Sequence, residues 1–248
     1  MIDKLLAPPP ELDYGIRVDK YHQIGEEYSR HCRELAGLAP DGRVLDVGCG
    51  FAPLAAGLTS YLSPEGSYVG IDAVPNGVEW ASRTISPHYP NFRFAWIDAY
   101  NQTYRPNGRL DPRSYRFPFE DDEFDLVYMR SVFTHMLPDD VENYLSEVRR
   151  VMKPGGRSLI TYFLLNSEST RLMGGEGSFI NFPHDYGVYS KHYPGPEGSI
   201  AYREGHVREL YRQVGLTIVG PIHFGYWCGR ESGRSSQDII IATKQEKG

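Results

Sequence analysis

Three aspartates recur at equivalent places in the first half of this 248-residue chain. Asp46, Asp72 and Asp98 each stand at or next to the end of a short apolar run that is typical of a buried strand. Because the carboxyl ends of parallel strands meet at one edge of a sheet, we expect the three carboxylates to lie on the same side of the molecule. Carboxylates there can accept hydrogen bonds from the hydroxyl and amino groups of a ligand.

Two glycines follow the first of these aspartates. Gly48 and Gly50 are separated by one cysteine, Cys49, and a helix is expected to begin near Pro53. Glycine can adopt a positive φ and lets a ligand approach the backbone closely. Strand, glycine turn and helix together predict a corner that binds an anion or a nucleotide.

The elements that position this corner alternate along the chain. Strand-like runs end at about residues 47, 72, 98, 129 and 163, and amphipathic helical segments precede or separate them. Two late runs, 216–223 and 238–243, can pair as an antiparallel hairpin. We therefore predict an α/β fold: a doubly wound, mostly parallel seven-stranded sheet with helices on both faces and a C-terminal antiparallel hairpin.

Two segments interrupt the alternation. Residues 99–119 carry four arginines, and residues 166–205 are rich in glycine and tyrosine and longer than an ordinary connection. We expect an N-terminal arm over 1–18 and a single domain over 19–248, with both insertions forming a substrate cap.

Composition excludes several classes. The net charge of −6 and the pI near 5.8 argue against a nucleic-acid surface. We find no apolar run of membrane-spanning length and no secretory signal, so a cytoplasmic protein is expected. The three cysteines are far apart, and no cluster of His or acidic residues has metal-ligand spacing, so no metal site is predicted.

The glycine corner departs from the dinucleotide pattern in two ways. Asp46 precedes Gly48 by two residues, and Pro53 stands where a third glycine would be. The segment 44–50 resembles the first motif of the S-adenosylmethionine-dependent methyltransferases of class I, with a Rossmann-like fold, of the bacterial small-molecule type. The resemblance covers roughly 21–162 and includes the segments 69–72, 124–127 and 145–156.

The resemblance implies S-adenosylmethionine as cofactor and a set of contacts to it. Asp72, followed by Ala73, would accept hydrogen bonds from both ribose hydroxyls, and Asp46 would orient the loop or meet the ammonium group. The remaining implied contacts are Gly48, Cys49 and Gly50 to the methionine portion, Asp98 and Ala99 to the adenine, and Arg130 and Ser131 to the sulfonium end.

A hydroxyl acceptor must lose its proton, and His135 follows the fourth strand at the ligand edge, where its near-neutral pKa suits a general base. A neutral histidine that caps or packs against a neighbouring segment is an equally good reading. We predict methyl transfer to a hydroxyl of a small molecule such as a sugar, glycan precursor or natural product. The alternatives are N-methylation of a small amine and an inactive donor-binding scaffold or regulator.

The acceptor contacts are expected in the later part of the chain. Aromatic faces with polar tips can stack on a sugar or an aromatic ring, although the same residues could form an ordinary aromatic cluster under a long loop. The candidates are Tyr186, His184, Trp227 and Arg230. The arginines of 99–119 either bind a substrate phosphate or carboxylate or are simply solvated.

Overall fold

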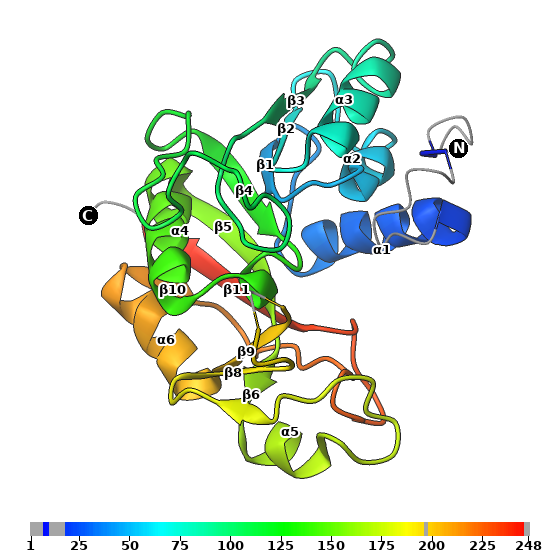
Figure 1. The fold of residues 1–248 in the computed structure, drawn as a ribbon. Coiled ribbons are helices and arrows are strands. Elements are labelled where there is room, and N and C mark those ends of the chain that lie inside the picture. Colours follow the sequence, from blue (N-terminus) through cyan, green and yellow to red (C-terminus); the bar gives the residue numbers. More distant parts are fainter. Residues whose placement is uncertain (1–6, 10–17, 196–197, 246–248) are drawn as a thin grey trace.

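The computed structural model describes residues 7–9, 18–195 and 198–245 (Figure 1). Most of the predicted N-terminal arm lies outside these residues. The described chain starts its regular structure with a short 3-10 helix, η2 (Val18–Lys20), followed by α1 (Tyr21–Glu34).

A seven-stranded sheet forms the centre of the fold, in the order β10-β11-β5-β4-β1-β2-β3. Strands β1 to β5 pair in parallel, whereas β11 pairs antiparallel with both β5 and β10. The strands are β1 (Arg43–Val47), β2 (Ser67–Asp72), β3 (Phe92–Trp96), β4 (Phe124–Met129), β5 (Met152–Tyr162), β10 (Leu216–Ile218) and β11 (Asp238–Lys244). The predicted fold class and C-terminal hairpin are confirmed.

Helices cover both faces of the sheet because the strands are apolar on both sides. In β1, Val44 packs into the cluster beneath α1 to α3, while Leu45 packs into the cluster beneath α4 and α6. Figure 1 shows these two groups of helices on opposite sides of the sheet. Their bounds are α2 (Pro53–Leu58), α3 (Pro75–Thr84), α4 (Pro138–Val151) and α6 (Glu204–Gln213).

The strand order reverses at β1, which lies between β2 and β4. Chain connections therefore leave β1 and β4 toward opposite faces, and a crevice opens at the carboxyl ends of these strands. In open α/β sheets this is the place where ligands bind.

The long segment after β5 contains a second sheet, which sequence patterns did not predict. It has the order β6-β9-β8-β7 and lies with the short helix α5 (Ser167–Leu172) below the main sheet in Figure 1. Its strands are β6 (Leu164–Leu165), β7 (His184–Asp185), β8 (Tyr189–Lys191) and β9 (Ile200–Arg203). Phe163, Phe182 and Trp227 form a separate small core there. A substrate-capping role for this segment stays a prediction.

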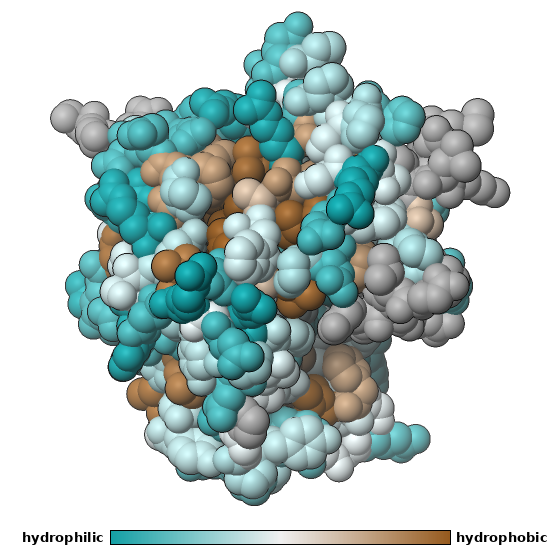
Figure 2. Space-filling view, turned by 45° about the horizontal axis from the view of Figure 1, so that its top comes forward, coloured by the Kyte–Doolittle hydropathy of each residue, from teal (hydrophilic) through white to brown (hydrophobic). Residues whose placement is uncertain are grey.

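On the face shown in Figure 2, hydrophobic surface gathers in a central hollow, and hydrophilic side chains surround most of it. None of the helices in the described part of the chain is both long and apolar enough to span a bilayer.

Candidate active site

A cavity of about 430 Å³ opens at the carboxyl ends of β1, β2 and β4. It collects residues from the glycine corner, the end of β2, the 99–119 insertion and the turn after β4. Of the residues predicted from sequence, those that line it are Asp46, Gly48, Cys49, Gly50, Asp72, Ala73, Ala99, Arg130, Ser131 and His135.

The glycine corner presents backbone to this cavity. Gly48 has φ +80° and Gly50 has φ +53°, both in the left-handed region that favours glycine. A Cβ built at Gly50 would meet no heavy atom within 4 Å, whereas one at Gly48 would lie 2.4 Å from Val132 Cγ2. The loop therefore leaves open space above Gly50 and packs its other glycine against the turn after β4.

Two backbone N–H groups fix the orientation of the Asp72 carboxylate. Its Oδ2 accepts the Gly50 N–H at 2.7 Å, and its Oδ1 accepts the Val74 N–H at 2.7 Å. Burial raises its pKa, and the backbone hydrogen bonds oppose that shift. Each oxygen has a second lone pair, so the carboxylate can also accept two neighbouring hydroxyls. The residues present thus fit a ribose, as the resemblance implied.

Asp46 lies deeper, below the same loop. Tyr68 donates its hydroxyl to Asp46 Oδ2 at 2.5 Å, and burial raises the pKa of Asp46 to about 7. A cationic group brought to this carboxylate would favour its ionised form and lower its pKa.

With the donor's ammonium group at Asp46, as the resemblance implies, donor binding should become tighter as the pH rises. The free carboxylate is largely protonated at pH 6 and largely ionised at pH 8, so the affinity for S-adenosylhomocysteine, whose ammonium would meet Asp46, should rise by roughly tenfold over that interval. Calorimetric titrations at a series of pH values measure the slope. The Asp46→Asn variant should lose the slope, and an unchanged slope in that variant would contradict the assignment.

The turn after β4 is fixed by hydrogen bonds to Thr161 in the neighbouring strand β5 and to Gln237, the residue before β11. Ser131 has φ +57°, its N–H donates to Thr161 Oγ1 at 2.9 Å, and its Oγ donates to Gln237 Oε1 at 3.0 Å. Arg130 next to it places its guanidinium carbon 4.3 Å from the ring centroid of Tyr28 in α1. In the described part of the chain no carboxylate pairs with Arg130.

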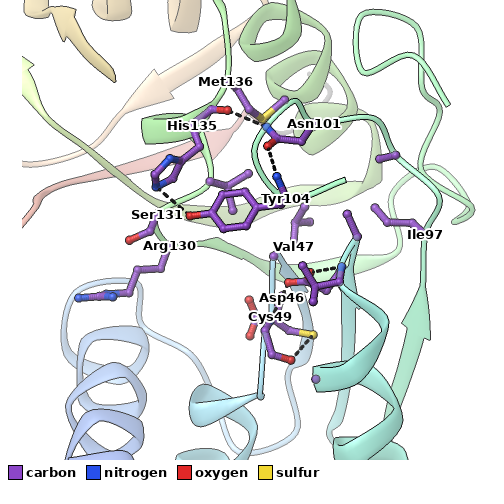
Figure 3. Close-up of a pocket in the computed structure, with 18 of the residues that line it drawn as sticks. Asp46, Val47, Cys49, Ile97, Asn101, Tyr104, Arg130, Ser131, His135 and Met136 are labelled. Atoms are coloured by element: carbon purple, nitrogen blue, oxygen red, sulfur yellow. Dashed lines mark hydrogen bonds between the residues drawn. The ribbon is translucent and has the colours of Figure 1, made fainter. Parts of the chain in front are cut away.

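His135 ends a 3-10 turn, η3 (Phe133–His135), and lines the cavity. Its Nε2 lies 3.3 Å from the Tyr104 hydroxyl, and its backbone carbonyl accepts the Asn101 side-chain amide at 2.9 Å (Figure 3). The turn is held from below because Tyr202 donates its hydroxyl to the Met136 carbonyl at 2.5 Å. A ring nitrogen at this place can reach a proton on a molecule in the cavity.

Among the lining residues that were not predicted from sequence, Asn101, Tyr104 and Tyr28 carry polar groups into the cavity wall. Asn101 and Tyr104 lie early in the 99–119 insertion, five and eight residues beyond the end of β3. This short distance from a strand end was a signal for a place at the ligand edge. For Tyr28 the helical spacing in α1 indicated only a core position.

Asp98 is not among the residues lining the cavity. Its carboxylate receives Arg105 Nε at 3.0 Å and Arg109 Nε at 2.6 Å, and these hydrogen bonds keep its pKa below the ordinary value. Asp98 therefore fastens the 99–119 insertion to the end of β3. Arg105 and Arg109 are thus used in the contact with Asp98. The other two arginines of the insertion also form ion pairs, Arg113 with Asp111 and Arg116 with Asp121.

The four predicted acceptor contacts also do not line the cavity. Trp227 is fully buried and donates its Nε1 to Asp238 Oδ2 at 2.9 Å, while Arg230 pairs with Glu168 and Asp238. Trp227 Nε1 and two of the three guanidinium nitrogens of Arg230 are thus used within the fold, whereas Arg230 Nη2 is buried without a hydrogen-bond partner among the described residues. Tyr186, stacked on Tyr189, and His184 in β7 belong to the second sheet.

Comparison with known proteins agrees with this geometry. The sequence profile described as a methyltransferase domain matches residues 44–156. The chain is 30% identical over 142 residues to the 2-phytyl-1,4-naphtoquinone methyltransferase of Trichormus variabilis, a match that covers 57% of this chain and 54% of that protein. It is 28% identical over 154 residues to the ubiquinone/menaquinone biosynthesis C-methyltransferase UbiE of Geotalea daltonii, covering 62% and 59%.

Residues 44–156, a little under half of the chain, thus match a methyltransferase domain. The chain's Rossmann-like fold is shared with a solved protein of Pyrococcus horikoshii at a TM-score of 0.63 and 18% identity, with 94% of each chain covered. The matches to the two curated relatives named above span 54% and 59% of those proteins' length. S-adenosylmethionine is the cofactor that the sequence resemblance implies, and the open space at Gly50 and the paired oxygens of Asp72 fit it. Within the described ranges no group of three or more His, Cys, Asp or Glu residues could hold a metal ion.

Proposed function

We propose that this methyltransferase moves a methyl group from S-adenosylmethionine to an oxygen of a small-molecule acceptor. The single observation that carries the proposal is the place of His135, whose Nε2 lies at the cavity near the Tyr104 hydroxyl, in the same cavity as Asp46 and Asp72. Methyl transfer to an acceptor that carries a proton requires a base on one side of the acceptor and the methyl donor on the other.

When bound, S-adenosylmethionine supplies a methyl group already activated on a sulfonium centre. The chain's own residues then have to orient it, exclude water and take up the acceptor's proton. Asp72 fixes the ribose by two oxygens whose directions are set by the Gly50 and Val74 N–H groups. His135 accepts the proton at Nε2.

Arg130 suits the donor's methionine carboxylate better than its sulfonium, since a guanidinium repels a neighbouring cation. In Figure 3 Arg130 extends toward α1 and away from His135 and Tyr104, and Val132, two residues beyond it, lies against Gly48 of the glycine corner. Asp46 for the ammonium and Arg130 for the carboxylate would match both charges of the amino-acid end.

Replacing Arg130 by glutamine should therefore weaken the binding of S-adenosylhomocysteine by about 10- to 100-fold, the value of a charge-assisted hydrogen bond. Decarboxylated S-adenosylmethionine has no carboxylate, so its affinity should change little. Titration calorimetry with both ligands makes the comparison, and an equal loss for the two would refute the contact.

Transfer to a ring carbon of a hydroquinone is the second candidate, because the curated relatives named above are quinone methyltransferases, one of them a C-methyltransferase. The same base serves both reactions, since an ionised phenol is nucleophilic at its oxygen and at its ring carbons. His135 is therefore compatible with either outcome.

Transfer of carbon-13-labelled methyl from S-adenosylmethionine into a metabolite extract tests the proposal. The chemical shift of the new methyl group separates attachment to oxygen, carbon and nitrogen. A labelled O-methyl product supports the primary proposal, and a C-methyl product supports the second candidate. An N-methyl product, or no product with a fully donor-bound protein, would overturn both.

A further inference from the structure

Tyr104 occupies the middle of the candidate active site. Figure 3 shows its ring between His135 and the glycine corner, with the hydroxyl directed at the histidine. The two rings meet edge to face, with centroids 5.2 Å apart, and the Tyr104 oxygen is 3.3 Å from His135 Nε2. A phenol therefore already stands where a proton-bearing acceptor would meet the base.

The side chain is held there loosely. Tyr104 is 48% exposed, unlike the core tyrosines, and among the described residues its hydroxyl bonds only to His135. The backbone below it is rigid by contrast. Asn101 Oδ1 accepts the N–H groups of Thr103 and Tyr104, both at 3.0 Å, and Asn101 and Arg105 pair through their backbones. Rotation about the Cα–Cβ bond thus suffices to turn the ring into solvent without moving the turn.

The size of the cavity points to such a movement. A volume of about 430 Å³ lies in the lower part of the range found for a site that holds one ligand. Methyl transfer requires donor and acceptor together. A lining group that turns outward would add space beside His135, and Tyr104 is half-exposed while Tyr144 and Met136 are buried.

We propose that the Tyr104 side chain is a gate: it occupies the acceptor's position beside His135 in the free protein and turns outward when the acceptor binds. We further propose that the acceptor is an aryl alcohol whose hydroxyl takes the place of the Tyr104 hydroxyl at His135. This proposal rests on the proposed function and adds the substrate class to it. The apolar walls at Val132, Met136 and Tyr144 suit the ring of such a molecule.

The step balances with the groups named. The acceptor's O–H proton passes to His135 Nε2, a bond forms between the acceptor oxygen and the methyl carbon, and the bond between that carbon and the donor sulfur breaks. The sulfur keeps the electron pair and becomes a neutral thioether.

The Tyr104→Ala variant tests the gate, with phenol as the probe because phenol is the part of the side chain that the substitution removes. Phenol should bind the variant in ligand-observed NMR without any donor present, as small aromatics fill engineered cavities. With labelled S-adenosylmethionine, anisole formation should rise at least about tenfold over wild type. Tyr104→Phe keeps the ring in place and should show neither effect.

Tyr226→Ala is the matched control, since Tyr226 is 44% exposed and lies outside the cavity lining. Titration with S-adenosylhomocysteine shows whether each variant is folded and binds the donor. If Tyr104→Ala binds it normally yet gains no phenol binding or anisole formation, the gate is wrong. If cyclohexanol gains as much as phenol, the aryl alcohol class is wrong. Failure of wild type to bind S-adenosylhomocysteine would instead overturn the proposed function, and the gate with it.

Discussion

Replacing His135 by alanine is expected to lower methyl transfer by about 10²- to 10⁴-fold, the usual contribution of a positioned general base. The imidazole lines the cavity, and its Nε2 is the group directed at the Tyr104 hydroxyl. The glycine corner and Asp72 do not depend on the imidazole. Affinity for S-adenosylhomocysteine should therefore stay within about twofold, so the loss falls on kcat.

Radiolabelled transfer and titration calorimetry on the same protein preparation separate these two effects. His135→Gln retains a hydrogen-bonding side chain without a basic nitrogen and should be as impaired as the alanine variant. His184→Ala is the matched control, because His184 pairs with Lys191 in the second sheet and does not line the cavity. Near-normal turnover in His135→Ala would show that the histidine is structural.

Replacing Asp72 by asparagine should weaken donor binding by about 10²-fold, which corresponds to about 2 to 3 kcal/mol for charge-assisted hydrogen bonds to a carboxylate. An amide cannot take the carboxylate's place. The Gly50 and Val74 N–H groups each point at one oxygen, so in either orientation the amide nitrogen would face a backbone donor. Asparagine therefore disturbs the glycine corner and also removes an acceptor for the ribose.

The effect of the Asp72 variant should fall on affinity, measured by titration with S-adenosylhomocysteine. Asp185→Asn supplies the control, because Asp185 pairs with Arg203 at the surface and is outside the cavity. An affinity for Asp72→Asn within twofold of wild type would remove Asp72 from the donor site.

That Asp46, Asp72 and the glycine corner line one cavity was predictable from sequence because it depends on local order. Each strand ends where its apolar run ends, and parallel pairing then brings Asp46, Asp72 and the turn after β4 to one edge whatever the insertions do. His135 was found for the same reason, since it lies six residues beyond the end of β4.

The acceptor half was not predictable because it depends on contacts between segments distant in sequence. Trp227 and Arg230 looked like ligand groups until their partner Asp238 was known. Asp98 carries the same strand-end signal as Asp72, but Arg105 and Arg109 fold back onto it. Tyr104 could be recognised as a cavity residue only from the structure, in which the insertion places its hydroxyl beside His135 Nε2.

We expect the cavity beside β1 to bind the methyl donor. Titration calorimetry of wild-type protein with S-adenosylhomocysteine tests it directly, with NADH as the comparison ligand because dinucleotide enzymes use a similar glycine corner. We predict saturable binding of S-adenosylhomocysteine at one site per chain and no binding of NADH. Absence of S-adenosylhomocysteine binding, or preferential binding of NADH, would contradict the account.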